Sequence, residues 1–163
     1  MAQVRRPTLS DADGARRDRD RGRHGHRPHL STVDEHATVP VVASVVRRGD
    51  RYLLGRRPAA KRHGGLWEFP GGKVLEGESR LEAARRELAE ELDLAVVSLG
   101  DLLLSVHDEG SPFVIEFFET VAEGTPVARE HTDLGWFGFP ELRSLALAPA
   151  DARFVAHLAR GNP

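Results

Sequence analysis

One segment of the chain, Arg80–Leu92, carries the signals of an amphipathic helix with a defined start. Ser79 is a typical N-cap residue, and Glu82, three positions later, completes a capping box. The apolar residues of the segment recur at helical spacing and fall on one face: Leu81, Ala84, Leu88 and Leu92. A helix with one apolar face must bury it against another layer of structure, so this segment constrains the fold more than any other.

Segments rich in β-branched and apolar residues flank this helix and predict the second layer. The expected strands are residues 38–46, 51–57, 102–107, 113–121 and 135–139, and a second helix is expected at 151–160. The glycine- and proline-rich stretch 58–77 predicts a loop. Strands and helices in this order predict an α+β fold, an α/β/α sandwich with a mixed β-sheet between helices.

The first 36 residues differ in composition from the rest of the chain. Arg, Asp, Gly and His dominate there and leave almost nothing to bury, so residues 1–36 are predicted to be a disordered arm. A solvated extension is the favoured interpretation of this arm, and a segment that touches RNA or a partner is the alternative. Residues 37–161 are expected to form one domain.

Composition excludes several classes of protein. The chain has no cysteine, which rules out disulfides, thiolate metal sites and cysteine nucleophiles. Its net charge of −2 argues against a nucleic-acid partner. No stretch has the length of apolar residues that a membrane span needs, and the first residues lack the apolar core of a secretory signal. We therefore expect a cytoplasmic protein that binds neither nucleic acid nor membranes.

Three carboxylates stand close together on the predicted helix. Glu87, Glu90 and Glu91 occupy positions i, i+3 and i+4, which brings their side chains within about one helical turn of one another. Hard oxygen ligands of this kind are what Mg²⁺ or Mn²⁺ prefers. A solvated, glutamate-rich helix face explains the same residues equally well, so the cluster alone does not decide between the two.

The spacing of the surrounding residues points to a family. Gly72, Glu78 and the run from Arg86 to Leu94 resemble the Nudix box, G-x5-E-x7-R-E-U-x-E-E-x-G-U, in which U is apolar. One position departs from it, because Asp93 stands where the family has a glycine that ends the helix in the left-handed conformation. Asp tolerates that conformation better than most residues, so the departure bears on the helix end and not on the metal ligands.

The resemblance continues outside the box and narrows to the MutT-type branch of the family. Residues 66–73, LWEFPGGK, are similar to the segment that precedes the box in that branch, and Glu130 to a loop glutamate that completes its metal site. Residues 147–151, LAPAD, are similar to a segment that lines the nucleobase pocket of CTP pyrophosphohydrolases and 8-oxo-dGTP-cleaving enzymes.

The resemblance implies a metal centre. The implied ligands of Mg²⁺ or Mn²⁺ are the main-chain carbonyl of Gly71 and the carboxylates of Glu87, Glu90, Glu91 and Glu130. Metal ions in such a site neutralise the triphosphate and activate water at neutral pH. Either Glu87 or Glu130 is expected to be the general base.

Two further box residues are expected to support the metal centre. Arg86 is expected to orient Glu87 through a bidentate, charge-assisted contact. Glu78 is expected to do the same or to bind an extra ion through water.

Four residues are candidates for substrate binding. Arg57 and Lys73 are candidates for contact with phosphate or base, at even odds against solvated surface charges. The ring of Phe69, like those of Trp67 and Trp136, could stack on a base, although a place in the core is favoured for all three. Asp151 would recognise the base by accepting a hydrogen bond from an exocyclic amine or, if protonated, by donating one to a ring carbonyl. The alternative is that Asp151 caps the second helix.

The expected function follows from the resemblance. It is hydrolysis of a nucleoside triphosphate to the monophosphate and pyrophosphate by metal-activated water, on 8-oxo-dGTP or CTP-like nucleotides, in a monomer or homodimer. A Nudix hydrolase of ADP-ribose, dinucleoside polyphosphates or capped RNA is the second reading, and a non-catalytic nucleotide-binding regulator is the third. The histidines that follow the arm, among them His63 and His131, show no ligand pattern and are expected at the surface or in loops.

Overall fold

The computed structural model describes residues 37–161, so the expected arm lies outside the described residues. Within this range the strands are β1 (Val39–Arg48), β2 (Arg51–Arg56), β3 (Trp67–Glu68), β4 (Gly71–Lys73), β5 (Ala95–His107), β6 (Phe113–Glu123) and β7 (Asp133–Gly138). The helices are α1 (Arg80–Leu92), α2 (Phe139–Leu142) and α3 (Pro149–Gly161). None of these helices is long and apolar enough to span a membrane.

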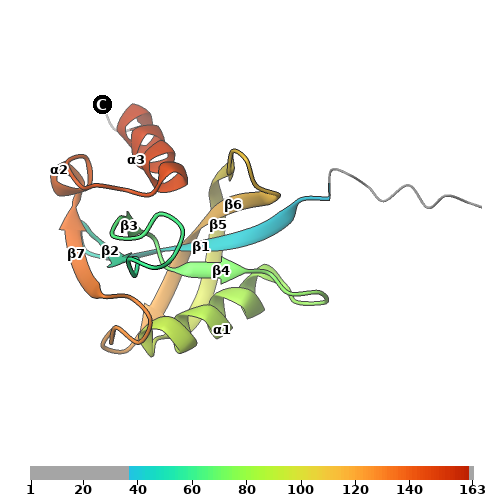
Figure 1. The fold of residues 1–163 in the computed structure, drawn as a ribbon. Coiled ribbons are helices and arrows are strands. Elements are labelled where there is room, and N and C mark those ends of the chain that lie inside the picture. The colour runs from blue at the N-terminus through green and yellow to red at the C-terminus, as the bar shows by residue number, and fades with distance from the viewer. Residues whose placement is uncertain (1–36, 162–163) are drawn as a thin grey trace, which may run out of the picture. The chain divides into compact units, whose positions relative to one another are not determined.

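The strands form a mixed sheet around β1 (Figure 1). β1 pairs in parallel with β6 and antiparallel with both β2 and β4. β5 extends the sheet beyond β6, while β3 and β7 both pair with β2. The first half of β1 pairs with β4 and its last residues pair with β2, so β2 and β4 share one edge of β1 while β6 occupies the other.

Helices cover the two faces of this sheet, as Figure 1 shows for α1 and α3. Alternate residues of β1 point to opposite faces. Val42 and Val46 pack with Leu88 and Leu92 of α1. Ala43 and Val45 pack with Phe154 and Val155 of α3 and with the buried ring of Phe117. The α/β/α arrangement predicted from the sequence is confirmed.

Helix α1 begins and ends as its sequence predicts. Ser79 is the N-cap, its side chain accepts from the Glu82 N–H, and the Glu82 carboxylate accepts from the Ser79 N–H. At the other end Asp93 is left-handed, with φ 59° and ψ 32°, and its N–H bonds to the last turn. Asp93 therefore ends the helix in the left-handed conformation that the glycine of the box would adopt.

The structure differs from the sequence prediction in several places, and the short helix α2 was not expected at all. The expected loop 58–77 contains the short strands β3 and β4, too brief to show a pattern. β5 begins at Ala95 rather than at residue 102, because irregularities in its pairing with β6 break the alternation of apolar residues. Helix α3 begins at Pro149, two residues before Asp151, so Asp151 lies inside the helix.

Candidate active site

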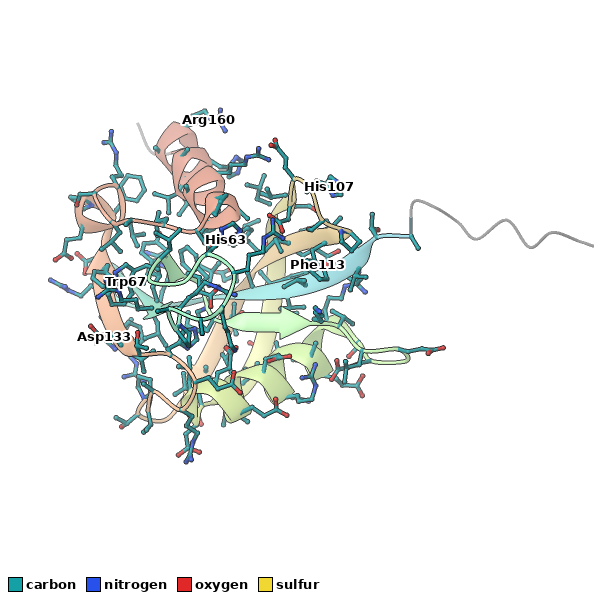
Figure 2. The ribbon with its side chains drawn as sticks, in the orientation of Figure 1. His63, Trp67, His107, Phe113, Asp133 and Arg160 are labelled. Atoms are coloured by element: carbon teal, nitrogen blue, oxygen red, sulfur yellow. The ribbon has the colours of Figure 1, made fainter. Side chains whose placement is uncertain are left out.

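A cavity of about 460 Å³ lies where β1 and β4 meet α1 and the start of α3. The charged side chains that line it are Arg57, Lys61, Glu68, Lys73, Glu87, Glu91, Asp108, Glu130 and Asp151. Figure 2 labels two further residues that line it, His63 on the loop after β2 and Phe113 at the start of β6. Segments far apart in the sequence therefore supply a single pocket with an excess of carboxylates.

Two glycines allow β4 to lie close to both β1 and helix α1. Gly71 has φ +154°, and a Cβ there would lie 1.8 Å from the Val42 carbonyl oxygen. A Cβ on Gly72 would lie 2.2 Å from the carboxylate carbon of Glu87. In this close approach the Gly71 N–H donates to Glu91 Oε2 at 3.1 Å. A side chain at Gly71 would collide with the main chain of β1, and one at Gly72 would collide with the Glu87 carboxylate, so β4 can lie this close to both neighbours only with glycine at these positions.

The three helix glutamates do not share one environment, which corrects the prediction of a common face. Glu87 and Glu91 line the cavity, and Glu91 is only 8% exposed. The Glu90 side chain is 55% exposed and is absent from the cavity lining. Successive residues of a helix are rotated by about 100° around its axis. Glu87 and Glu91, four positions apart, therefore point in nearly the same direction, whereas Glu90 points about 100° away from Glu91.

Arg86 is bonded to several groups beside the cavity. It donates to both oxygens of Glu78, from Nε at 2.8 Å and from Nη2 at 3.0 Å. It also donates to Glu87 Oε1 at 2.7 Å and to the Lys73 carbonyl at 2.9 Å. The bidentate contact expected with Glu87 is thus made with Glu78 instead, and Glu87 receives a single bond. The hydrogen bonds from Arg86, a further one from the Leu75 N–H and the charge of Arg86 hold the pKa of Glu78 down at about 2.

The carboxylates around the cavity repel one another. Burial raises the pKa of Glu91 to about 8, with further contributions from the charges of Glu87, Glu68 and Glu130. Within residues 37–161, no three acidic or histidine side chains already stand at the spacing that holds a metal ion. The fit to a divalent cation is therefore one of charge and donor type: hard oxygens carry an excess of negative charge that such an ion would neutralise.

A fourth glutamate in the cavity, Glu68, escaped the sequence analysis. Its Oε1 lies 3.1 Å from His131 Nε2, and its Oε2 accepts from Arg57 Nη1. His131 was expected at the surface or in a loop; it lies in the loop before β7, but its side chain is only 3% exposed. The available signal was the position of Glu68 inside the LWEFPGGK segment, between two aromatic residues with no obvious need for a charge.

Asp151 lies in the same cavity and is not the cap of a helix. Its Oδ1 accepts from the Phe69 N–H at 2.7 Å, and burial raises the pKa of its carboxyl to about 8. The Phe69 ring is buried and makes edge contacts with the rings of Tyr52, Phe117 and Phe154. Phe69 therefore contributes a main-chain donor to the pocket, while its ring belongs to the core.

The two predicted cations both line the cavity but have different surroundings. Arg57 donates to Glu68 and, through Nε, to the Arg62 carbonyl at 2.7 Å. Lys73 Nζ lies 4.6 Å from the centre of the Phe113 ring. Arg57 is thus held by the protein itself, whereas the ammonium group of Lys73 rests on an aromatic face beside the carboxylates.

Comparison with known proteins decides the family. Residues 37–158 match the family model described as NUDIX domain, which is most of the chain. The chain belongs to the Nudix family. The resemblance drawn from the box is therefore confirmed, and Nudix hydrolases generally use divalent metal ions.

Similar Nudix proteins include two named nucleotide hydrolases and a solved structure. The CTP pyrophosphohydrolase of Escherichia coli K12 is 39% identical over 116 residues, which are 69% of this chain and 85% of that protein. The oxidized purine nucleoside triphosphate hydrolase of Mus musculus is 34% identical, with 66% and 71% covered. The crystal structure of a MutT Nudix hydrolase from Burkholderia pseudomallei has a TM-score of 0.67 at 29% identity, and the match covers 74% of this chain and 98% of that one.

The contacts of Arg86 predict how this Nudix site should respond to a change. Replacing Arg86 with Ala removes the donor that orients Glu87, so we expect Mn²⁺ affinity, measured by isothermal titration calorimetry, to fall by about 10- to 100-fold. Arg85→Ala is the matched control, because Arg85 is exposed and, within residues 37–161, donates only to the Val96 carbonyl. Equal affinities for the two variants would contradict this role for Arg86.

Proposed function

We propose that this Nudix protein is a Mg²⁺-dependent nucleoside triphosphate pyrophosphohydrolase, with Mn²⁺ as a substitute, that acts on oxidised or CTP-like nucleotides. The observation that carries the proposal is the convergence of Glu87, Glu91 and Glu130 on one cavity that also holds Asp151. The three glutamates suit a metal-bound triphosphate, and the buried carboxyl of Asp151 suits a hydrogen bond with the nucleobase. The names of the similar bacterial and mouse proteins support this choice of substrate.

The carboxylates divide the work between binding and proton transfer. A bound divalent ion would neutralise the phosphates and make water a better nucleophile at neutral pH. Glu87, Glu91 and the Gly71 carbonyl would hold such an ion, with Glu90 contributing from the rim. Glu130 is better placed than Glu87 to take the proton from water, because Glu87 already accepts from Arg86, whereas the only charged partner of Glu130 in the described part of the chain is Lys61 Nζ at 4.0 Å.

The cations of the cavity suit the phosphate chain. Lys61 and Lys73 both line it, and neither donates a hydrogen bond to another side chain within residues 37–161. Flexible ammonium groups of this kind can follow the charge of the phosphates. Arg57 would act on the pocket mainly through Glu68, because its guanidinium is already engaged there.

Asp151 favours an oxidised purine over cytosine as the first substrate. With a pKa near 8, its carboxyl carries a proton at neutral pH, and since Oδ1 accepts from Phe69, the proton would be on Oδ2. A protonated carboxyl can donate to a ring carbonyl, which an oxidised guanine offers. The exocyclic amine of cytosine would need the ionised form instead. We therefore place 8-oxo-dGTP before CTP.

Pyrophosphate release tests the proposed reaction. With 8-oxo-dGTP, CTP and ADP-ribose as substrates, we expect release from the triphosphates, and Glu91→Gln should lower kcat by about 100-fold or more because a neutral amide cannot replace a charged ligand. Glu119→Gln, an exposed change on β6, is the control and should leave kcat unchanged. Orthophosphate as the first product, or full activity in Glu91→Gln, would refute the proposal.

The raised pKa of Asp151 predicts opposite pH dependences for the two bases. Between pH 7 and 9 the carboxyl loses its proton, so KM for 8-oxo-dGTP should rise by about tenfold, while KM for CTP should fall. Asp151→Asn keeps an acceptor for Phe69 and a donor at every pH, so its KM for 8-oxo-dGTP should stay level over this interval. Parallel pH profiles in the wild type and Asp151→Asn would exclude Asp151 as the group that reads the base.

A further inference from the structure

We infer that the contact between His131 and Glu68 is a latch that positions Glu130 over the cavity. The inference rests on the proposed function, in which Glu130 serves the reaction. It makes Glu68 a positioning residue and not a metal ligand, although Glu68 is one of the carboxylates that line the pocket.

His131 is the buried anchor of the loop between β6 and β7. The His131 ring approaches Glu68 through Nε2, and because a carboxylate only accepts, Nε2 carries the hydrogen. The ring sits against the main chain of β2: a Cβ on Gly55 would lie 2.5 Å from two of its carbon atoms. Because Gly55 has no side chain, the His131 ring can occupy this space. The position of the ring in turn fixes the position of Glu130, the residue that precedes it.

Glu68 differs from the other carboxylates of the cavity in how its oxygens are used. Each of its two oxygens has a protein donor, Arg57 for one and His131 for the other. Glu87 and Glu91 each have one oxygen bonded within the described residues and one left over. Glu68 therefore joins two walls of the pocket, whereas Glu87 and Glu91 keep an oxygen for a ligand.

Main-chain bonds hold the loop on both sides of Glu130. The N–H groups of Val127 and Arg129 donate to the carbonyls of Leu92 and Glu91 at 2.8 and 3.0 Å, and the N–H of Thr132 donates to the Arg56 carbonyl at 3.0 Å. Figure 1 shows this orange loop beside the end of α1. Between these tethers the side chain of Glu130 is 45% exposed and, among residues 37–161, forms an ion pair only with Lys61. In the proposed latch the buried His131 ring adds the side-chain contact that orients this stretch.

The kinetic test couples the latch to Glu130. Glu68→Gln keeps the size of the side chain but cannot accept from both partners, and His131→Ala removes the anchor. Each should lower kcat by about 10- to 100-fold with little change in KM, because a small misplacement of a catalytic group has that effect. In a Glu130→Gln background neither change should lower kcat further.

Arg129→Gln is the control on the same loop. It removes an exposed pair with Asp93, 3.1 Å long, and should change kcat less than twofold. Losses that multiply in the double variants would overturn the latch, as would an effect of Arg129→Gln equal to that of His131→Ala.

Amide hydrogen exchange tests the latch without any catalysis. In Glu68→Gln and His131→Ala the amides of residues 127–132 should exchange faster than in the wild type, while those in the middle of α1 should not change. Unchanged exchange in the loop would overturn the inference. If the wild type released no pyrophosphate, the proposed function would fail, and the exchange rates would still show whether His131 holds the loop.

Discussion

The close approach of β4 to helix α1 is the constraint on which the site depends. Gly71 and Gly72 carry no side chain where one would collide with Val42 or Glu87, and the Gly71 N–H bonds directly to Glu91. That approach places a helix carboxylate in a half-closed pocket and keeps it there against the repulsion of its neighbours. The apolar contacts of Leu88 and Leu92 on the other side of the helix supply the stability that offsets this repulsion.

The glutamates around the cavity look alike in composition but differ in their partners. Glu78 is bonded doubly to Arg86, Glu68 is shared by Arg57 and His131, and Glu91 accepts from main chain. A carboxylate whose two oxygens both accept hydrogen bonds from the protein has a structural role. A carboxylate with one oxygen that has no protein donor can still bind a ligand. In the proposed function the cluster therefore contains both the carboxylates that would bind a ligand and the carboxylates that hold these in place.

Much of this could be predicted from the sequence, because its signals are local. The capping box of α1, the apolar stripe and the box spacing all lie within one short segment, and the left-handed Asp93 followed from its place at the helix end. What could not be predicted depends on contacts between distant segments. Arg86 makes its bidentate contact with Glu78 and only a single bond to Glu87, and the Phe69 ring lies in the core. The His131 side chain is buried against Glu68 and Gly55. A pattern along the chain shows none of these contacts.

The central claim is that Glu87 and Glu91, held by β4, bind the divalent ion on which hydrolysis depends. Crystals soaked with Mn²⁺ and a non-hydrolysable nucleotide test it most directly, since anomalous scattering locates the ion without reference to activity. The account predicts an anomalous peak about 2 Å from a carboxylate oxygen of each of these two residues, with the phosphates on its open side. A peak bound only by the exposed Glu90, or none in the cavity, would contradict it.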